Sequence, residues 1–74
     1  SQPGEIAGRK ELLDQALARI DPDLRAIFLL REVERLSYRD IAKALQIPEG
    51  TVGSRLNRAR RELQQHLADL GYEP

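Results

Sequence analysis

The sequence contains no cysteine, only three aromatic residues and no long run of apolar residues. The lack of cysteine excludes disulfide bridges and thiolate metal sites, and it fits a reducing cytosol. No stretch approaches the roughly 18 consecutive apolar residues of a membrane span, and no signal-peptide pattern opens the chain. We therefore expect a soluble, cytoplasmic protein with no membrane partner, whose core consists mostly of Leu, Ile, Val and Ala.

An excess of charge of one sign is also missing. Twelve basic and twelve acidic residues give a net charge of zero, so the strongly basic pI of many nucleic-acid-binding domains is absent. The distribution is uneven, however. Residues 1–36 hold six basic and seven acidic side chains, residues 37–67 hold six and three, and residues 68–74 hold two acidic ones. The positive charge is therefore concentrated in residues 37–67.

A chain of 74 residues forms one small domain, which buries only about 60% of the surface that the unfolded chain exposes. With 41% hydrophobic and 32% charged residues, the composition is typical of a globular rather than a disordered chain. We expect residues 1–8 to be a linker or cloning remnant, residues 9–70 to form the domain, and residues 71–74 to be a C-terminal tail.

Apolar residues recur at helical spacing along the chain, and no segment alternates as a strand would. The predicted fold class is therefore all-α, with four helices: from about Arg9 onward, from Asp21 to about Arg35, from Tyr38 to Leu45, and from about Glu49 to Leu67 or beyond. The second helix has apolar residues on more than one face, so we expect it to be the central and most buried one.

Local signals mark where the helices begin. Asp21 before Pro22 can cap the second helix, and Ser37, followed three residues later by Asp40, resembles a capping box for the third. Residues 46–48 (Gln-Ile-Pro) break the helical pattern, because proline favours extended geometry in the residue before it and suits the start of a helix. A short helix, a three-residue turn and a long helix form a helix-turn-helix.

The fourth helix has an apolar side and a polar side. Four apolar residues fall within about 60° of Val52 on the helical wheel: Leu56, Ala59, Leu63 and Leu67. The opposite side holds Thr51, Ser54, Asn57, Arg58, Arg61 and Gln65, and Arg55 and Arg60 flank the apolar stripe. Such a face is either solvated surface or a recognition helix for the DNA major groove, where Arg pairs with guanine and Asn with adenine. The hydroxyls, and the backbone N–H groups around Gly50, suit phosphate oxygens.

Three blocks within residues 21–63 resemble the fourth conserved region of bacterial sigma factors, especially those of the extracytoplasmic-function type. The pattern R-x-x-F-x-L-R-E begins at Arg25, L-S-Y-x-x-I-A begins at Leu36, and I-P-x-G-T-V-x-S-R-L-x-R-A-R-x-x-L runs from Ile47 to Leu63. Together these blocks are far more specific than a generic helix-turn-helix.

The resemblance implies a promoter recognition domain in transcription initiation. Such a domain holds the minus-thirty-five element of promoter DNA in the major groove, docks on the β flap of RNA polymerase and is often masked by an anti-sigma factor. By position, the resemblance places DNA contacts at Thr51, Gly53, Ser54, Asn57 and Arg58, with Arg55 and Arg60 nearer to phosphate or packing, and with Arg39 able to reach the DNA backbone. Gly50 and Arg61 complete the expected DNA-binding set.

Three residues depart from the family pattern. Gly53 stands where relatives often have Lys or Arg, and a glycine in a helix interior costs about 1 kcal/mol relative to Ala. It either loses a contact to DNA or allows the backbone closer to it. Gln46 and Arg35 stand where relatives often have Gly; at Gln46 a left-handed backbone would cost on the order of 1 kcal/mol.

Two other functions remain open on the sequence alone. The DNA-binding domain of a LuxR-type response regulator shares the Ser-x-x-x-Ile-Ala and Thr-Val spacings, but it lacks the S-R-L-x-R-A-R run. A helical module that acts mainly through contacts with an anti-sigma factor or polymerase also fits the net charge of zero. An enzyme is not indicated, because His66 is isolated and the acidic residues lack the partners of a metal site. We predict no catalytic residue, metal site or cofactor.

Overall fold

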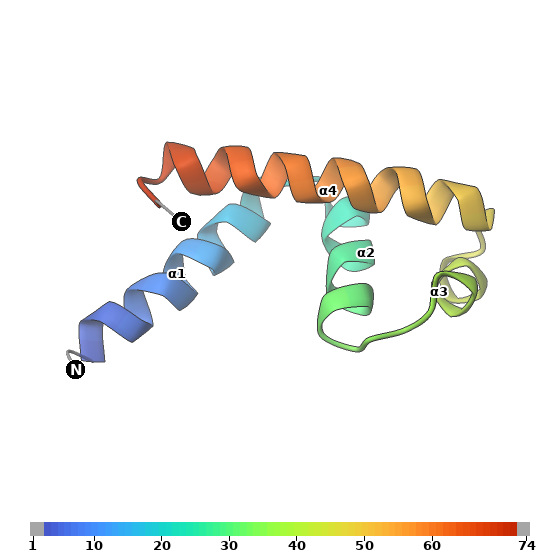
Figure 1. Cartoon of the computed structure of the whole chain (residues 1–74), viewed down its shortest axis with the longest axis horizontal. Coiled ribbons are helices and arrows are strands. Elements are labelled where there is room, and N and C mark those ends of the chain that lie inside the picture. Colours follow the sequence, from blue (N-terminus) through green and yellow to red (C-terminus); the bar gives the residue numbers. More distant parts are fainter. Residues whose placement is uncertain (1–2, 73–74) are drawn as a thin grey trace.

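The structure, a computed structural model, describes residues 3–72, and within this range every regular element is an α-helix (Figure 1). The elements are α1 (Pro3–Arg19), α2 (Pro22–Glu32), α3 (Tyr38–Leu45) and α4 (Glu49–Asp69). α4 runs along the length of the molecule, and α3 lies at its N-terminal end (Figure 1). The predicted all-α fold is confirmed. None of the described helices is both long and apolar enough to cross a membrane.

Two predicted helix boundaries are wrong. α1 begins at Pro3 rather than at about Arg9, and proline is compatible with a helix start because its missing N–H would have no partner there. α2 ends at Glu32 rather than at about Arg35, because the chain turns after Val33 and Arg35 adopts a positive φ of 59°. The predicted bounds of α3 and the predicted start of α4 are confirmed. The division into residues 1–8, 9–70 and 71–74 stays a prediction.

Two clusters of buried apolar side chains hold the helices together, and α4 contributes to both. One cluster joins the α1 segment, α2 and the C-terminal half of α4: Ala16, Leu17, Ile20, Leu24, Ala59 and Leu63. The other joins α2, α3 and the N-terminal half of α4: Ile27, Ile41, Ala42, Val52 and Leu56. Among the described residues, no polar or charged residue is buried.

α4 shares the central position with α2, which packs against α1, α3 and α4 and contributes to both clusters. α4 packs against each of the other three helices. α2 buries only Leu24 and Ile27, whereas α4 buries four residues along one stripe. The apolar residues of α2 are spread around the helix, and only the side that meets α4 and its neighbours is covered. Val33 therefore stays 66% exposed. α2 is thus central, as predicted, but it is not the most buried helix, because α4 buries more residues.

The predicted caps at the starts of α2 and α3 are confirmed. The Asp21 carboxylate accepts a hydrogen bond from the backbone N–H of Asp23 at 2.8 Å. The Ser37 hydroxyl accepts one from the backbone N–H of Asp40 at 3.0 Å. Each cap satisfies a first-turn donor and is worth about 1 kcal/mol. These local bonds fix where the chain enters each helix.

α3 and α4 each end in a turn of the same type, with a different residue at its left-handed position. After α3, the Ile47 N–H bonds to the Ala42 carbonyl at 3.0 Å across Gln46, which is left-handed with φ 57°. After α4, the same turn places Gly71 at the left-handed position, with φ 93°. This Schellman motif favours glycine, which has no Cβ to clash. Gln46 is therefore strained where Gly71 is not. This is the left-handed conformation whose cost was considered for Gln46 from the sequence.

Replacing Gln46 with glycine should stabilise the domain. Relief of the left-handed strain, about 1–2 kcal/mol, exceeds the extra entropy that glycine gives the unfolded chain, about 0.4–1 kcal/mol. We expect Gln46→Gly to raise the free energy of unfolding by roughly 0.5–1 kcal/mol, which for a domain of this size raises the melting temperature by about 2–8 °C. Thermal unfolding followed by circular dichroism measures the shift. Gln46→Ala is the control, because it keeps the Cβ; an equal gain in both variants would contradict this explanation.

Candidate nucleic-acid interface

The N-terminal half of α4 turns one side to the core and the other to solvent. Val52, Leu56 and Ala59 have no exposed surface. On the opposite side lie hydroxyl, amide and guanidinium groups, all exposed: Ser54, Asn57, Arg58 and Arg61. We call these four residues the donor face. The predicted division of the helix into a buried stripe and an exposed polar side is confirmed.

The start of α4 is open as well. Pro48 precedes the helix with ψ 147°, and no side chain caps the first turn. A Cβ on Gly50 would meet nothing within 4 Å, so the backbone there is uncovered. Helix N-termini bring together unpaired N–H groups and a partial positive charge, which favour anionic oxygens. Thr51, half-buried in the same turn, lies next to this end of the donor face.

The two arginines that flank the buried stripe point to α2 rather than to the donor face. Arg60 donates a hydrogen bond from its Nη2 to a Glu32 carboxylate oxygen at 2.9 Å. This hydrogen bond, with the negative charge of Glu32, raises the pKa of the Arg60 guanidinium above its ordinary value. Arg55 is half-buried and lines a small pocket with Ile27 and Leu45. Both positions agree with packing roles; a DNA contact by either arginine stays a prediction.

Gly53 faces the aromatic ring of Tyr38. A Cβ on Gly53 would lie 3.6 Å from the Tyr38 Cε2, an ordinary van der Waals contact. The Arg31 guanidinium lies over the same ring, 5.2 Å from its centroid, and donates a hydrogen bond to the Leu36 carbonyl at 2.9 Å. Tyr38 thus ties the start of α3 to both α2 and α4. This link, which joins residues of all three sequence blocks, was not predicted from the sequence.

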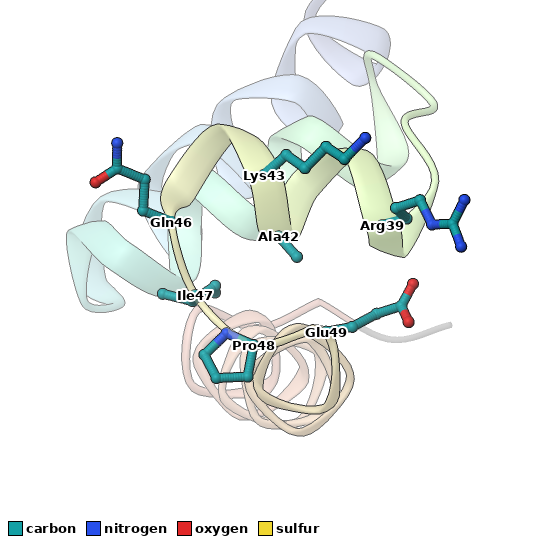
Figure 2. A pocket seen from close by; sticks show the side chains of 7 residues that line it. All are labelled: Arg39, Ala42, Lys43, Gln46, Ile47, Pro48 and Glu49. Carbon is teal, nitrogen blue, oxygen red and sulfur yellow. The ribbon is translucent and has the colours of Figure 1, made fainter.

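α3 adds two basic side chains beside the turn. A shallow groove of about 400 Å³ runs between α3 and the start of α4 (Figure 2). Arg39 and Lys43 extend from α3 on one side, and Glu49 extends from the start of α4 on the other (Figure 2). Arg39 was predicted from the sequence as a DNA contact, whereas Lys43 was not. Lys43 could have been predicted from the sequence, because it lies four residues after Arg39 and so on the same side of the helix.

The site has no feature of a metal centre. Within residues 3–72, no group of His, Cys, Asp or Glu side chains is arranged to hold a metal ion. Asp14 forms an ion pair with Lys10 at 3.0 Å.

A short helix, a tight turn and a long helix with an exposed donor face together define a helix-turn-helix domain, the class in which the second helix meets the DNA major groove. A family model described as sigma-70, region 4 matches residues 10–63. The chain therefore belongs to the sigma-70 region 4 family.

Curated relatives bear similar names. The chain is 46% identical over 56 residues to the RNA polymerase sigma-H factor of Pseudomonas aeruginosa, which covers 76% of the chain and 29% of that protein. It is 41% identical over 56 residues to the ECF RNA polymerase sigma factor SigE of Mycolicibacterium smegmatis (76% and 22%) and 40% identical over 68 residues to the ECF RNA polymerase sigma-E factor of Haemophilus influenzae (81% and 36%). The chain thus spans between about a fifth and somewhat over a third of these relatives.

Adding a methyl group at Gly53 should stabilise α4. Glycine in a helix interior costs about 1 kcal/mol relative to alanine, and the new Cβ makes only an ordinary contact with Tyr38. We expect Gly53→Ala to raise the free energy of unfolding by roughly 1 kcal/mol in a denaturant titration. Gly50→Ala, in the first turn of the same helix, is the control and should gain less. A loss of stability in Gly53→Ala would show that α3 and α4 need glycine to approach this closely.

Proposed function

We propose that this domain recognises the minus-thirty-five element of a promoter by placing α4 in the major groove. The observation that supports the proposal is the donor face, which stands opposite the buried stripe. The major groove is about 12 Å wide and admits one helix. Asn57 and Arg58 then read adenine and guanine edges, and the Ser54 hydroxyl, the open start of α4 and Arg61 bind phosphate or base edges.

Phosphate contacts would continue along α3. In helix-turn-helix complexes the first helix crosses the DNA backbone while the second enters the groove. Arg39 and Lys43 are exposed on α3, beside the turn that leads to α4. They would fix the register of the domain on the duplex without reading its sequence. The carboxylate of Glu49 lies opposite them and would limit how closely a phosphate enters the groove between the helices.

The names of the relatives support a role for the full-length protein as a sigma factor that directs bacterial RNA polymerase to promoters. A LuxR-type response regulator is not favoured, because the family match and the curated relatives all belong to sigma factors. We further propose that the domain contacts the polymerase through α2. Val33 is 66% exposed and Leu29 is 36% exposed, and both line a hollow with Ala26, Leu30 and Glu34.

The α2 hollow suits a protein partner rather than DNA, because its lining is mainly apolar and exposed apolar patches often mark protein interaction sites. α2 packs on α4 with its other side, so the hollow remains uncovered while the donor face of α4 is on DNA. We assign it to the β flap of RNA polymerase. An anti-sigma factor would mask the domain by covering the same hollow.

Truncation of Arg58 should weaken specific binding of DNA. The test uses the tightest-binding duplex selected from a randomised pool and a scrambled version of it, in fluorescence-anisotropy titrations at two salt concentrations. We expect Arg58→Ala to lower the affinity for the selected duplex by roughly 1–3 kcal/mol, as for loss of a bidentate base contact, and to relax the preference at one base pair. Scrambled DNA should lose less.

Lys10→Ala is the matched control, because it removes one positive charge from an exposed ion pair on α1 and should leave both affinities unchanged. An equal loss on both duplexes in Arg58→Ala would reduce Arg58 to a phosphate contact. A wild-type domain that binds every duplex equally would overturn promoter recognition itself.

A charge placed in the α2 hollow should disrupt polymerase binding alone. We expect Val33→Asp to weaken binding to a purified β flap domain at least tenfold in calorimetric titration, because a carboxylate would have to be desolvated in an apolar contact. Unfolding and DNA affinity should change little, since Val33 is largely exposed. Gln15→Asp, on the exposed side of α1, is the control for the added charge. Unchanged flap binding in Val33→Asp would exclude this hollow as the docking site.

A further inference from the structure

An acidic side chain that has no evident use in binding DNA lies beside the donor face. Glu62 lies one helical turn after Arg58, and its carboxylate accepts a hydrogen bond from the Arg58 Nε at 2.7 Å. The side chain of Arg58 is 62% exposed and that of Glu62 is 33% exposed. The pair therefore lies at the surface, with the carboxylate nearer to the body of the helix and the guanidinium farther out.

Helix stabilisation is a weak reason for this pair. Ion pairs four residues apart add about 0.2–0.5 kcal/mol to a helix, and the favourable order places the acidic residue first. Here the arginine comes first, so the pair is in the less favourable order. The negative charge also lies next to the face that would approach phosphates, where it opposes binding. A function in recognition explains both features.

The geometry of the pair fits such a function. An arginine guanidinium has five N–H donors in a rigid planar fork. The Glu62 carboxylate accepts the hydrogen bond from Nε–H, the donor nearest the helix. The two terminal nitrogens are thus the ones that would make a bidentate contact with a base. A guanidinium held at one edge also has less rotational freedom to lose when it binds. The pair thus presents the end of the fork in a restricted orientation.

We propose that Glu62 raises the specificity of DNA binding by orienting Arg58 for a base and by offsetting its charge toward phosphates. This inference rests on the proposed function, with Arg58 at the base edges. Non-specific affinity arises from phosphate neutralisation, and each neutralised phosphate contributes about −0.9 to the slope of log affinity against log salt. The negative charge of Glu62 reduces the attraction of Arg58 to phosphates. It does not reduce the directional contact of Arg58 with a base. Glu62 is a positioning residue that acts through Arg58.

Glu62→Gln tests this proposal, because it removes the charge and keeps the size of the side chain. In anisotropy titrations over a salt series, we expect the affinity for the scrambled duplex to rise roughly three- to tenfold and its salt slope to steepen by up to about one charge. The affinity for the selected duplex should stay level or fall, so the ratio of the two affinities should drop roughly three- to tenfold.

Asp14→Asn is the matched control, since Lys10 and Asp14 form an exposed pair with the same spacing and order on α1. It should alter neither affinity. A second comparison introduces Glu62→Gln into Arg58→Ala. If Glu62 acts through Arg58, the ratio of affinities should change little in this background. Thermal unfolding of each variant shows that the domain stays folded.

An equal rise on both duplexes would overturn the proposal, because Glu62 would then only repel DNA. Unchanged affinities, or the same drop in the ratio without Arg58, would overturn it as well. These results differ from a failure of the proposed function. In that case the wild-type domain would show no preference for any duplex, whereas failure of this inference leaves the wild-type preference intact.

Discussion

The structure depends on one contact, in which the apolar stripe of α4 packs against the three preceding helices. Val52, Leu56, Ala59 and Leu63 lie on one side of α4, and burying a side chain of valine or leucine is worth about 1.5–3 kcal/mol. Rotation of α4 about its axis would expose this stripe to water. The orientation of the opposite side, and with it that of the donor face, is therefore fixed by the core. A recognition helix needs this property, because base readout requires side chains that stay in register with the groove.

The orientation of α4 relative to α3 depends on two further features. The left-handed Gln46 reverses the chain after α3, and Ile47 then joins the second buried cluster. Tyr38 meets Gly53 on α4 and Arg31 on α2, so the start of α3 is fixed to both neighbours. The first feature is strained, whereas the second leaves room for a Cβ at position 53 in ordinary van der Waals contact with Tyr38. Gln46 and Gly53, which depart from the family pattern, thus both lie where α3 and α4 meet.

Charge pairing explains how a neutral domain can present arginines to an anionic partner. Arg60 pairs with Glu32 across helices, and Arg58 pairs with Glu62 along α4. Such exposed pairs add at most about 1 kcal/mol each to stability. Their larger effect is on the field that DNA would meet, because a domain with no net charge gains little from long-range attraction. Under the proposed function, binding by this domain depends on the arrangement of a few donors more than on the sum of its charges.

The sequence by itself determined the features that depend on neighbours along the chain. The caps at Asp21 and Ser37, the bounds of α3, the turn before Pro48 and the exposure of the donor face follow from spacings of a few residues. Family membership also followed, because the three blocks are contiguous patterns. The tertiary structure decided that α4 shares the central position with α2, that Val33 remains exposed, and that Tyr38 links three helices. Periodicity shows which faces are apolar but not how many partners are available to cover them. A chain this small covers only some of these apolar faces, and contacts between distant segments decided which ones are buried.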